Sequence, residues 1–308
     1  TIYYFKAGGV MTYFINKVTS FSNKTLANLA MLFTVVCWGI SFISIKVVVN
    51  EIPPITTACF RFLITSIFLW IALHKIEPKH HLTVKIMPKL ALGGFLGITL
   101  YFCCENTGIK LTTASNASLI TALVPILAIG LDVIFFKSKL SLSKICGIII
   151  ALIGTYLIVT ASGNIDFSSD TFKGNMFMIG AMSSWAFYTI LNKFLQAQHS
   201  ALFLVTYQTI FGAMFLVPLS LFEFNQWHSF SLLAFANILF LAIICSAIGY
   251  FLYSFALKNL DVTVTTIYLN LTPIIGILSG YLILNESILP LQLLGGFLVI
   301  LSIYIANR

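Results

Sequence analysis

The sequence predicts an all-α membrane protein with ten transmembrane helices arranged as two inverted five-helix repeats. Its 308 residues are 59% hydrophobic and only 8% charged, and the mean hydropathy is +1.01. Soluble domains carry about 25% charged residues, so this chain is expected to fold in lipid. Apolar runs long enough to cross a bilayer follow one another along the chain, and residue types recur at a fixed spacing between its halves.

The first apolar run, residues 27–49, has the features of a membrane-spanning helix. It exceeds the roughly 20 residues that a helix needs to cross the hydrocarbon core. Its one charged residue is Lys46. A charge at the centre of such a helix costs about 2.5–3.5 kcal/mol on insertion scales, so Lys46 is expected to have a partner or a function. Pro53 and Pro54 follow and end the helix.

Nine further apolar runs predict the other spans, and the connectors between them are too short for an extramembrane domain. The second span carries Arg61, and the third carries Tyr101 and Glu105. The predicted spans are 27–49, 55–73, 90–107, 114–136, 145–161, 174–196, 201–222, 231–256, 262–284 and 290–306.

These spans divide the chain into two units. Residues 27–161 form the first five-helix repeat, 162–173 a hydrophilic connector, and 174–306 the second repeat. Residues 1–26 are expected to form an N-terminal tail. Two interpretations stay open: residues 1–24 form an amphipathic segment in the membrane interface, or residues 1–10 are a non-native extension before Met11.

The repeat is visible in residues that recur at a constant offset. Trp38 and Trp185 stand 147 residues apart, and Pro125 and Pro273 stand 148 apart, which requires one inserted residue. Because each unit has five spans, the second must enter the membrane in the opposite orientation. Inverted repeats are typical of secondary transporters, which bind substrate near the midplane between the halves. Further pairs are Lys46–Lys193 at 147, and Lys110–Lys258, Gly147–Gly295 and Tyr156–Tyr304 at 148.

Charge predicts the orientation. Lysines concentrate in the N-terminal tail and in the loops 74–89 and 137–144, which share one side if the spans alternate. The opposite side carries mainly acidic residues. Because Lys and Arg collect in cytoplasmic loops, we expect a multi-pass protein of the inner (plasma) membrane with both termini cytoplasmic.

Three groups of residues in a fixed order resemble a known family. They are Trp38-Gly39-x-Ser41-Phe42-x-x-x-Lys46 with Pro54 and Arg61-Phe62, then Thr113-Ala114-Ser115-Asn116-Ala117-Ser118 with Leu123-Val124-Pro125, then Asn285-Glu286-Ser287 with Gly295-Gly296. In this order they resemble the EamA family of the drug/metabolite transporter superfamily. The resemblance implies ten helices, a central cavity between the halves, and movement of small metabolites, often amino acids or drug-like compounds and often outward.

A set of aromatic, hydroxyl and amide residues within the spans is expected to line the solute path. Buried phenols and amides need partners in lipid, so they tend to face the bundle or a wet cavity. Trp38 and Trp185 hold equivalent positions in oppositely oriented units and should face one central space. Plain helix packing is the alternative for any single residue. The substrate-binding candidates are Trp38, Ser41, Tyr101, Asn116, Trp185, Tyr188, Asn192, Tyr250, Tyr268 and Asn270.

Three charged residues within the spans are candidates for charge recognition or proton coupling. Lys46 and Arg61 could attract a carboxylate substrate, or they could extend toward the interface with Glu51 as a partner. The second repeat has Gln208 at the position that matches Arg61. Glu105 could carry a proton, or it could pair with Lys110.

Pro125 and Pro273, within the fourth span of each unit, are candidate hinges, with a static kink as the alternative.

The sequence therefore predicts a secondary transporter that moves small amphipathic metabolites or drug-like solutes by alternating access, with export as the expected direction. Uptake of an amino-acid or nucleotide-like metabolite is the alternative. The motifs H-E-x-x-H, G-x-S-x-G and G-x-x-x-x-G-K are absent, so no enzyme activity, metal or cofactor is expected. The expected partners are a small-molecule substrate and the lipid bilayer, without nucleic acid, and a homodimer stays open.

Overall fold

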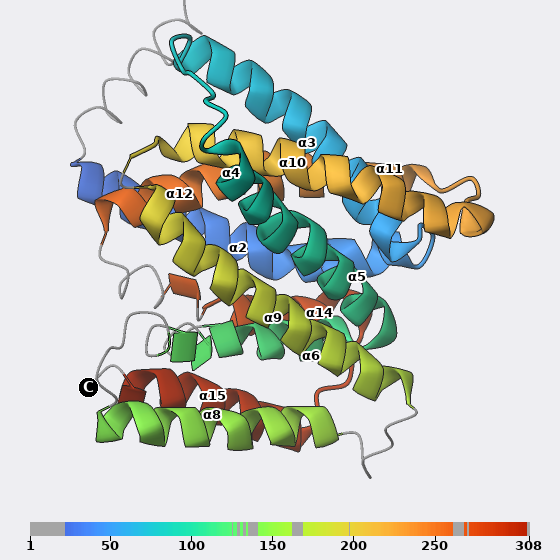
Figure 1. Ribbon diagram of the computed structural model, residues 1–308. Helices are drawn as coiled ribbons and strands as arrows, with labels where there is room; N and C mark the ends of the chain where they lie inside the picture. Colours follow the sequence, from blue (N-terminus) through green and yellow to red (C-terminus); the bar gives the residue numbers. More distant parts are fainter. Residues whose placement is uncertain are drawn as a thin grey trace, which may run out of the picture.

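The apolar runs fold as helices in the computed structural model (Figure 1). It describes residues 22–124, 126–127, 130–131, 134, 141–161, 169–196, 198–260, 268–269 and 271–306. Within these ranges the regular structure is entirely helical, and ten helical rods follow the ten predicted spans, so the predicted fold class is confirmed. Pro125 and Asn270 lie outside the described residues.

Five rods belong to the first half of the chain. The third is interrupted by a π-helical segment, η1, and α6 continues into a short 3-10 segment, η2. Their elements are α2 (Asn23–Val49), α3 (Pro54–Ile76), α4 (Met87–Gly94), η1 (Phe95–Leu100), α5 (Tyr101–Leu111), α6 (Ala114–Ile120), η2 (Thr121–Leu123) and α8 (Leu142–Thr160).

The second half repeats this pattern, with a π-helical segment, η4, again in its third rod. Its elements are α9 (Asp170–Leu195), α10 (Ala201–Ser220), η3 (Leu221–Gln226), α11 (Leu232–Leu239), η4 (Phe240–Ile248), α12 (Gly249–Asn259), α14 (Leu271–Leu284) and α15 (Pro290–Ala306).

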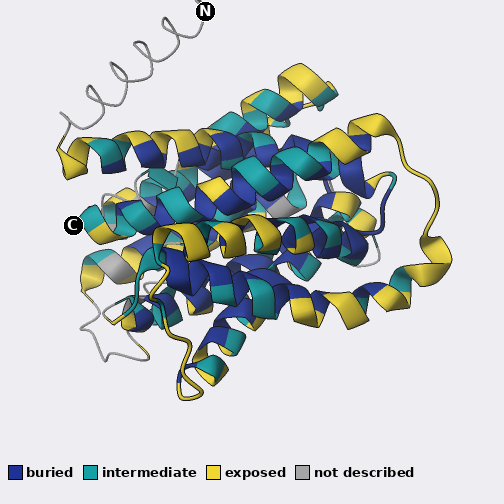
Figure 2. Ribbon diagram, turned by 90° about the horizontal axis from the view of Figure 1, so that it is seen from above, coloured by how far each residue is buried: buried dark blue, intermediate teal, exposed yellow. Residues whose placement is uncertain are grey.

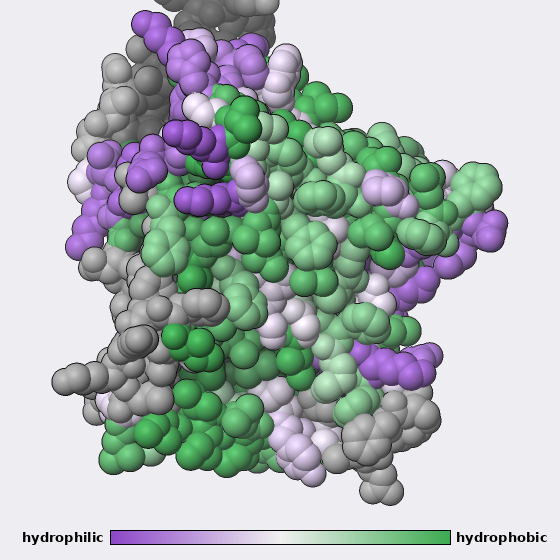
Figure 3. Space-filling model, viewed as in Figure 1, coloured by the Kyte–Doolittle hydropathy of each residue, from purple (hydrophilic) through white to green (hydrophobic). Residues whose placement is uncertain are grey.

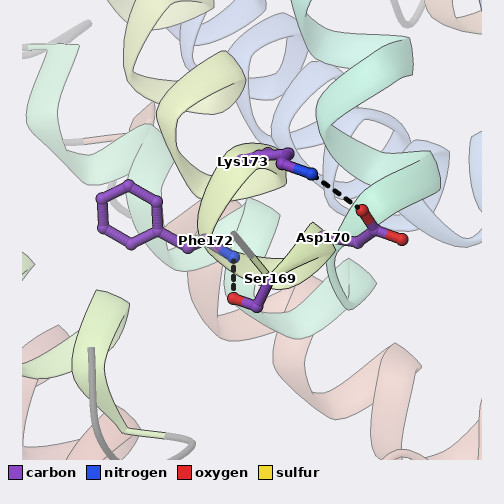
Figure 4. A network of polar contacts seen from close by, with 4 residues as sticks. All are labelled: Ser169, Asp170, Phe172 and Lys173. Atoms are coloured by element: carbon purple, nitrogen blue, oxygen red, sulfur yellow. Dashed lines mark hydrogen bonds and ion pairs between the residues drawn. The ribbon is translucent and has the colours of Figure 1, made fainter. Parts of the chain in front are cut away.

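Serine and threonine side chains start several of these helices. At α9, the Ser169 hydroxyl accepts a hydrogen bond from the Phe172 amide at 3.2 Å, which satisfies a donor that the first helical turn leaves free. Figure 4 shows this cap together with the ion pair between Lys173 and Asp170, at 3.5 Å. Within the predicted connector 162–173, Asp170 already belongs to α9.

The outer surface of the bundle is suited to lipid. Leu152 and Leu282 expose 63% and 72% of their surfaces. Figure 2 shows buried residues toward the inner faces of the helices and exposed residues on the outer faces, and Figure 3 shows a broad hydrophobic surface with hydrophilic residues mainly at its edges. Such an apolar exterior is not tolerated in water, so the chain is a multi-pass membrane protein.

Helices pair across the two halves. Matching helices lie against each other: α3 against α10, α6 against α14, and α8 against α15, the last pair side by side in Figure 1. Gly154 and Gly295 allow the close approach of α8 and α15, because a Cβ on Gly154 would lie 2.7 Å from the Gly295 carbonyl oxygen. The first rod of each half packs on the third rod of the other, α2 on α12 and α9 on α5.

The two π-helical segments carry contacts between the halves. A π-helical turn displaces the regular hydrogen bonds, so backbone carbonyls become available to neighbouring side chains. Trp38 Nε1 in α2 donates to the Cys245 carbonyl in η4 at 2.9 Å, and the Ser184 hydroxyl in α9 donates to the Leu96 carbonyl in η1 at 2.7 Å. These hydrogen bonds join the first rod of each half to the third rod of the other.

Glutamates also join the halves by capping helices. The Glu223 carboxylate, in η3, accepts from the Ile55 amide at 3.1 Å and from the Thr56 amide at 2.7 Å, at the start of α3. It also accepts from the Thr56 hydroxyl at 2.8 Å. The carboxylate thus satisfies free amides at the positive end of the helix dipole.

Glu286 does the same for α6. Asn285, after the end of α14, adopts a left-handed conformation with φ 53°, and Glu286 follows it. Its carboxylate accepts from the Ala114 amide at 2.8 Å and the Ser115 amide at 2.9 Å. Two further glutamates contact the N-cap serine of a helix in the other half: Glu51 with Ser231 at α11, and Glu77 with Ser200 at α10.

Candidate functional site

A cavity lies between the two halves. Its walls come from α2, α3, α5 and η2 of the first half and from α9, α12 and α14 of the second. The empty space between the walls is about 670 Å³, its opening included. Its lining consists of Trp38, Ser41, Phe42, Arg61, Tyr101, Phe102, Glu105, Thr121, Ala122, Val124, Met182, Trp185, Tyr250, Leu269 and Thr272.

Aromatic rings from both halves form one wall. The rings of Trp38 and Trp185 meet edge to face with centroids 5.9 Å apart. Tyr250 packs against both, at 5.8 and 5.7 Å, and Tyr101 lies 5.0 Å from Trp185. Such rings offer a large apolar surface at little cost in conformational entropy, and they suit the apolar body of a small solute.

Arg61 is the cation of the cavity, and only 3% of its surface is exposed. Its Nε donates to the Ser246 hydroxyl in η4 at 2.7 Å, and its guanidinium lies 4.4 Å from the centroid of the Phe102 ring. The Nη1 atom is buried without a hydrogen-bond partner among the described residues. The guanidinium is therefore fixed on one edge and one face, and its Nη1 atom has no partner there.

Glu105, one turn beyond Tyr101 on α5, is the acidic residue of the cavity lining and is 4% exposed. The Tyr101 hydroxyl donates to its Oε1 at 2.7 Å. Among the described residues, one pair of opposite charges lies within 4.0 Å, namely Lys173 and Asp170. Neither Arg61 nor Lys110 therefore forms an ion pair with Glu105. The alternative for Glu105 in which it pairs with Lys110 is therefore not observed.

Other candidates take part in polar networks beyond the cavity lining. The Tyr188 hydroxyl donates to Gln208 Oε1 at 3.2 Å, and Gln208 Nε2 donates to Asn192 Oδ1 at 2.9 Å. All three side chains are buried. This network occupies the place in the second half that matches Arg61 in the first.

Asn116 belongs to a second network, between the two halves. Its Oδ1 accepts from Gln292 Nε2 at 2.8 Å, and its Nδ2 donates to Asn175 Oδ1 at 3.2 Å. The Tyr268 hydroxyl donates to Asn28 Oδ1 at 3.1 Å, close to the start of α2. These contacts place Asn116 and Tyr268 outside the cavity lining.

The Lys46 side chain caps the C-terminal end of α5. Its ammonium donates to the carbonyls of Ile109, Lys110 and Thr112 at 2.7, 3.1 and 2.5 Å. A cation is favourable at the negative end of a helix dipole. Glu51, its expected partner, instead binds Ser231.

The candidate hinge Pro273 is buried in α14, and Thr272 beside it lines the cavity. Sequence reasoning missed several lining residues, among them Phe102 and Met182, because an apolar residue on a cavity wall has no signal that separates it from one in the core. It also missed Ser246, which orients Arg61 from η4.

A model of the EamA-like transporter family matches residues 25–160 and again residues 172–308. This chain belongs to the EamA-like transporter family. The two matches of this EamA-like chain cover nearly all of it, one in each half.

Curated relatives carry transporter names. An uncharacterized transporter of Archaeoglobus fulgidus is 30% identical over 93% of this chain and 98% of its own length. A probable terminal-alkyne amino-acid exporter of Streptantibioticus cattleyicolor is 26% identical over 91% and 92%. A probable amino-acid metabolite efflux pump of Salmonella typhimurium is 27% identical over 89% and 92%.

A solved crystal structure also resembles the chain. It covers 92% of this chain and 98% of its own, with a TM-score of 0.65 and 14% sequence identity. At this identity the likeness concerns the fold alone.

Proposed function

We propose that this EamA-like protein is a secondary transporter that exports small amphipathic metabolites of the amino-acid type. The observation that carries the proposal is the central cavity, because its walls come from both halves and combine an aromatic surface with the buried ionisable side chains of Arg61 and Glu105. An aromatic surface suits the apolar body of a solute, and buried charges suit its polar end. The names of the relatives from Streptantibioticus and Salmonella support the amino-acid class and the outward direction.

The cycle would be alternating access between two arrangements of the halves. In inverted repeats the substrate site lies near the bilayer midplane, and one half moves against the other around it. The contacts that such a movement must rearrange are those that cross between the halves, including the glutamate caps on α3 and α10. We place the protein in the cytoplasmic (inner) membrane, with both termini and Lys79 on the cytoplasmic side, on the basis of the lysine bias.

Flux in proteoliposomes tests the proposal. Vesicles loaded with a panel of radiolabelled amino acids and their derivatives should exchange label with external unlabelled solute only when the purified protein is present, and the solute should be chemically unchanged. Loss of exchange across the whole panel, or chemical conversion of the solute, would contradict a transporter. Imposed gradients of either sign then distinguish export from uptake.

Orientation is tested by labelling single cysteines in a variant without the native ones. With cysteine in place of Lys79 or of Asn225, in the connection between α10 and α11, an impermeant maleimide added to intact cells should label only position 225. Labelling at position 79 would reverse the proposed topology.

A further inference from the structure

Three residues of the cavity lining each have a polar side-chain atom that is buried without a hydrogen-bond partner among the described residues. These atoms are Arg61 Nη1, the Tyr250 hydroxyl and Thr272 Oγ1. A buried polar group without a partner costs about 1–3 kcal/mol, and more when it is charged. Three such atoms in residues that line one cavity indicate that a polar group bound there supplies their missing hydrogen-bond partner.

The chemistry of these atoms defines that group. A guanidinium has only donors, and phenol and threonine hydroxyls can also donate, so the missing partner is an acceptor. The bond from Arg61 Nε to Ser246 and the contact with the Phe102 ring hold the guanidinium in one orientation. A carboxylate is the common biological acceptor that matches a fixed guanidinium.

The second half shows that helix packing does not require this charge. Gln208 occupies the matching position, and its amide is paired on both sides, with Tyr188 and with Asn192. The polar group there is neutral and both its oxygen and its nitrogen have a partner, whereas Arg61 is charged and its Nη1 atom has none. The difference places anion recognition in the first half only.

We propose that Arg61 binds the carboxylate of the transported solute, with the Tyr250 hydroxyl as a second donor. This assignment adds the chemical class of the solute to the proposed function, and it rests on that function in one respect, namely that the cavity is the solute site. The rings of Trp38 and Trp185 would contact the apolar body of the solute. Arg61 is the one cationic side chain among the lining residues, so a second carboxylate would be buried without a cation, and the solute class is the monocarboxylates, with or without an amino group.

The experiment measures binding to the purified full-length protein in detergent, by calorimetry. Three probes share one aromatic body: 3-phenylpropanoate has one carboxylate, 2-phenylsuccinate has two, and phenethylamine has an amine in place of the acid. The first should bind at least about 10-fold more tightly than phenethylamine, since a hydrogen bond to a charged group is worth about that factor or more. It should also bind more tightly than 2-phenylsuccinate, because the second carboxylate of that probe would be buried without a cation.

Variants locate the effect. Arg61→Gln installs the residue of the matching position and should weaken 3-phenylpropanoate binding about 10-fold or more. Arg61→Lys should retain the preference for the monocarboxylate, at reduced affinity. Lys258→Gln removes an exposed cation in the last turn of α12, outside the cavity, and should bind as the unmodified protein does.

The ligand series keeps the test decisive even if Arg61→Gln does not fold. Binding of phenethylamine or 2-phenylsuccinate as tight as that of 3-phenylpropanoate would overturn the assignment. So would unchanged monocarboxylate binding in Arg61→Gln. Monocarboxylate binding without flux in vesicles would refute transport and leave the Arg61 site standing, whereas flux of amines alone would refute the site and leave transport standing.

Discussion

The indole rings of Trp38 and Trp185 meet edge to face across the two halves, with centroids 5.9 Å apart and planes at 89°. The residues hold the same position in the two repeats, 147 residues apart. Equivalent residues of the two inverted repeats therefore touch each other at the wall of the cavity. Any movement of one half against the other changes the surface that this pair offers to a solute.

Trp185→Phe should lower flux several-fold while the protein inserts normally. The change preserves an aromatic ring but reduces the contact surface of the cavity wall. Initial flux rates per reconstituted protein provide the measurement. The matched control is Trp70→Phe on α3, since Trp70 is 49% exposed and lies outside the cavity lining. Equal loss of flux in both variants would contradict a specific role of the cavity wall.

Lys46→Met should destabilise the protein by about 1–3 kcal/mol, because it leaves the carbonyls at the end of α5 without their donor. The Lys46 ammonium lies outside the cavity lining, so flux per folded molecule should stay near that of the unmodified protein. Denaturation in mixed micelles and flux measured on the same preparation separate the two effects. Loss of flux at full stability would instead give Lys46 a role in charge recognition.

Glu223→Gln should lower stability by about 1 kcal/mol, because the cap at α3 loses its charge and part of its acceptor capacity. The melting temperature in detergent reports the change. Asp170→Asn is the control, since the exposed ion pair with Lys173 in Figure 4 contributes little. A melting temperature that falls equally in both variants would contradict a specific cap.

Acid should weaken the contact between Glu51 and Ser231. Hydrogen bonds from the Ser231 amide, at 2.6 Å, and hydroxyl, at 2.8 Å, lower the pKa of Glu51 below its ordinary value of 4.5. The folded state therefore binds the proton less readily than the unfolded state, and the contribution is present above pH 4.5 and lost as the pH falls through the lowered pKa. The stability difference between the unmodified protein and Glu51→Gln should shrink in acid, and a difference that is the same at pH 7 and pH 3 would contradict this contact.

The spans and their repeat could be predicted from the sequence, because lipid imposes length and apolarity on every crossing helix. The meeting of Trp38 and Trp185 follows from equal spacing in oppositely oriented units. The partner of Lys46 could not be predicted, because it is a set of backbone carbonyls on a helix distant in sequence. Backbone atoms are the same for every residue type, so such a pairing leaves no pattern.

The two polar networks also escaped prediction. Asn116 and Asn192 are amides in apolar helices, and such residues suit a wet cavity or a dry pairing between helices equally well. Their partners, Gln292 and Gln208, decide between these environments, and both partners come from other helices. The π-helical segments η1 and η4 could not be predicted either, because each is a continuation of an apolar run with no residue type that marks a π-helical turn.

Because of the glutamate caps, two helices of the first half can be completed only after the second half has been synthesised. The N-terminus of α3 is capped by a residue 168 positions later in the chain, and that of α6 by one 172 positions later. A ribosome that has delivered the whole first half to the membrane has therefore left these helix ends without their acceptors. The first half therefore lacks these helix caps until the second half has been inserted and packs beside it.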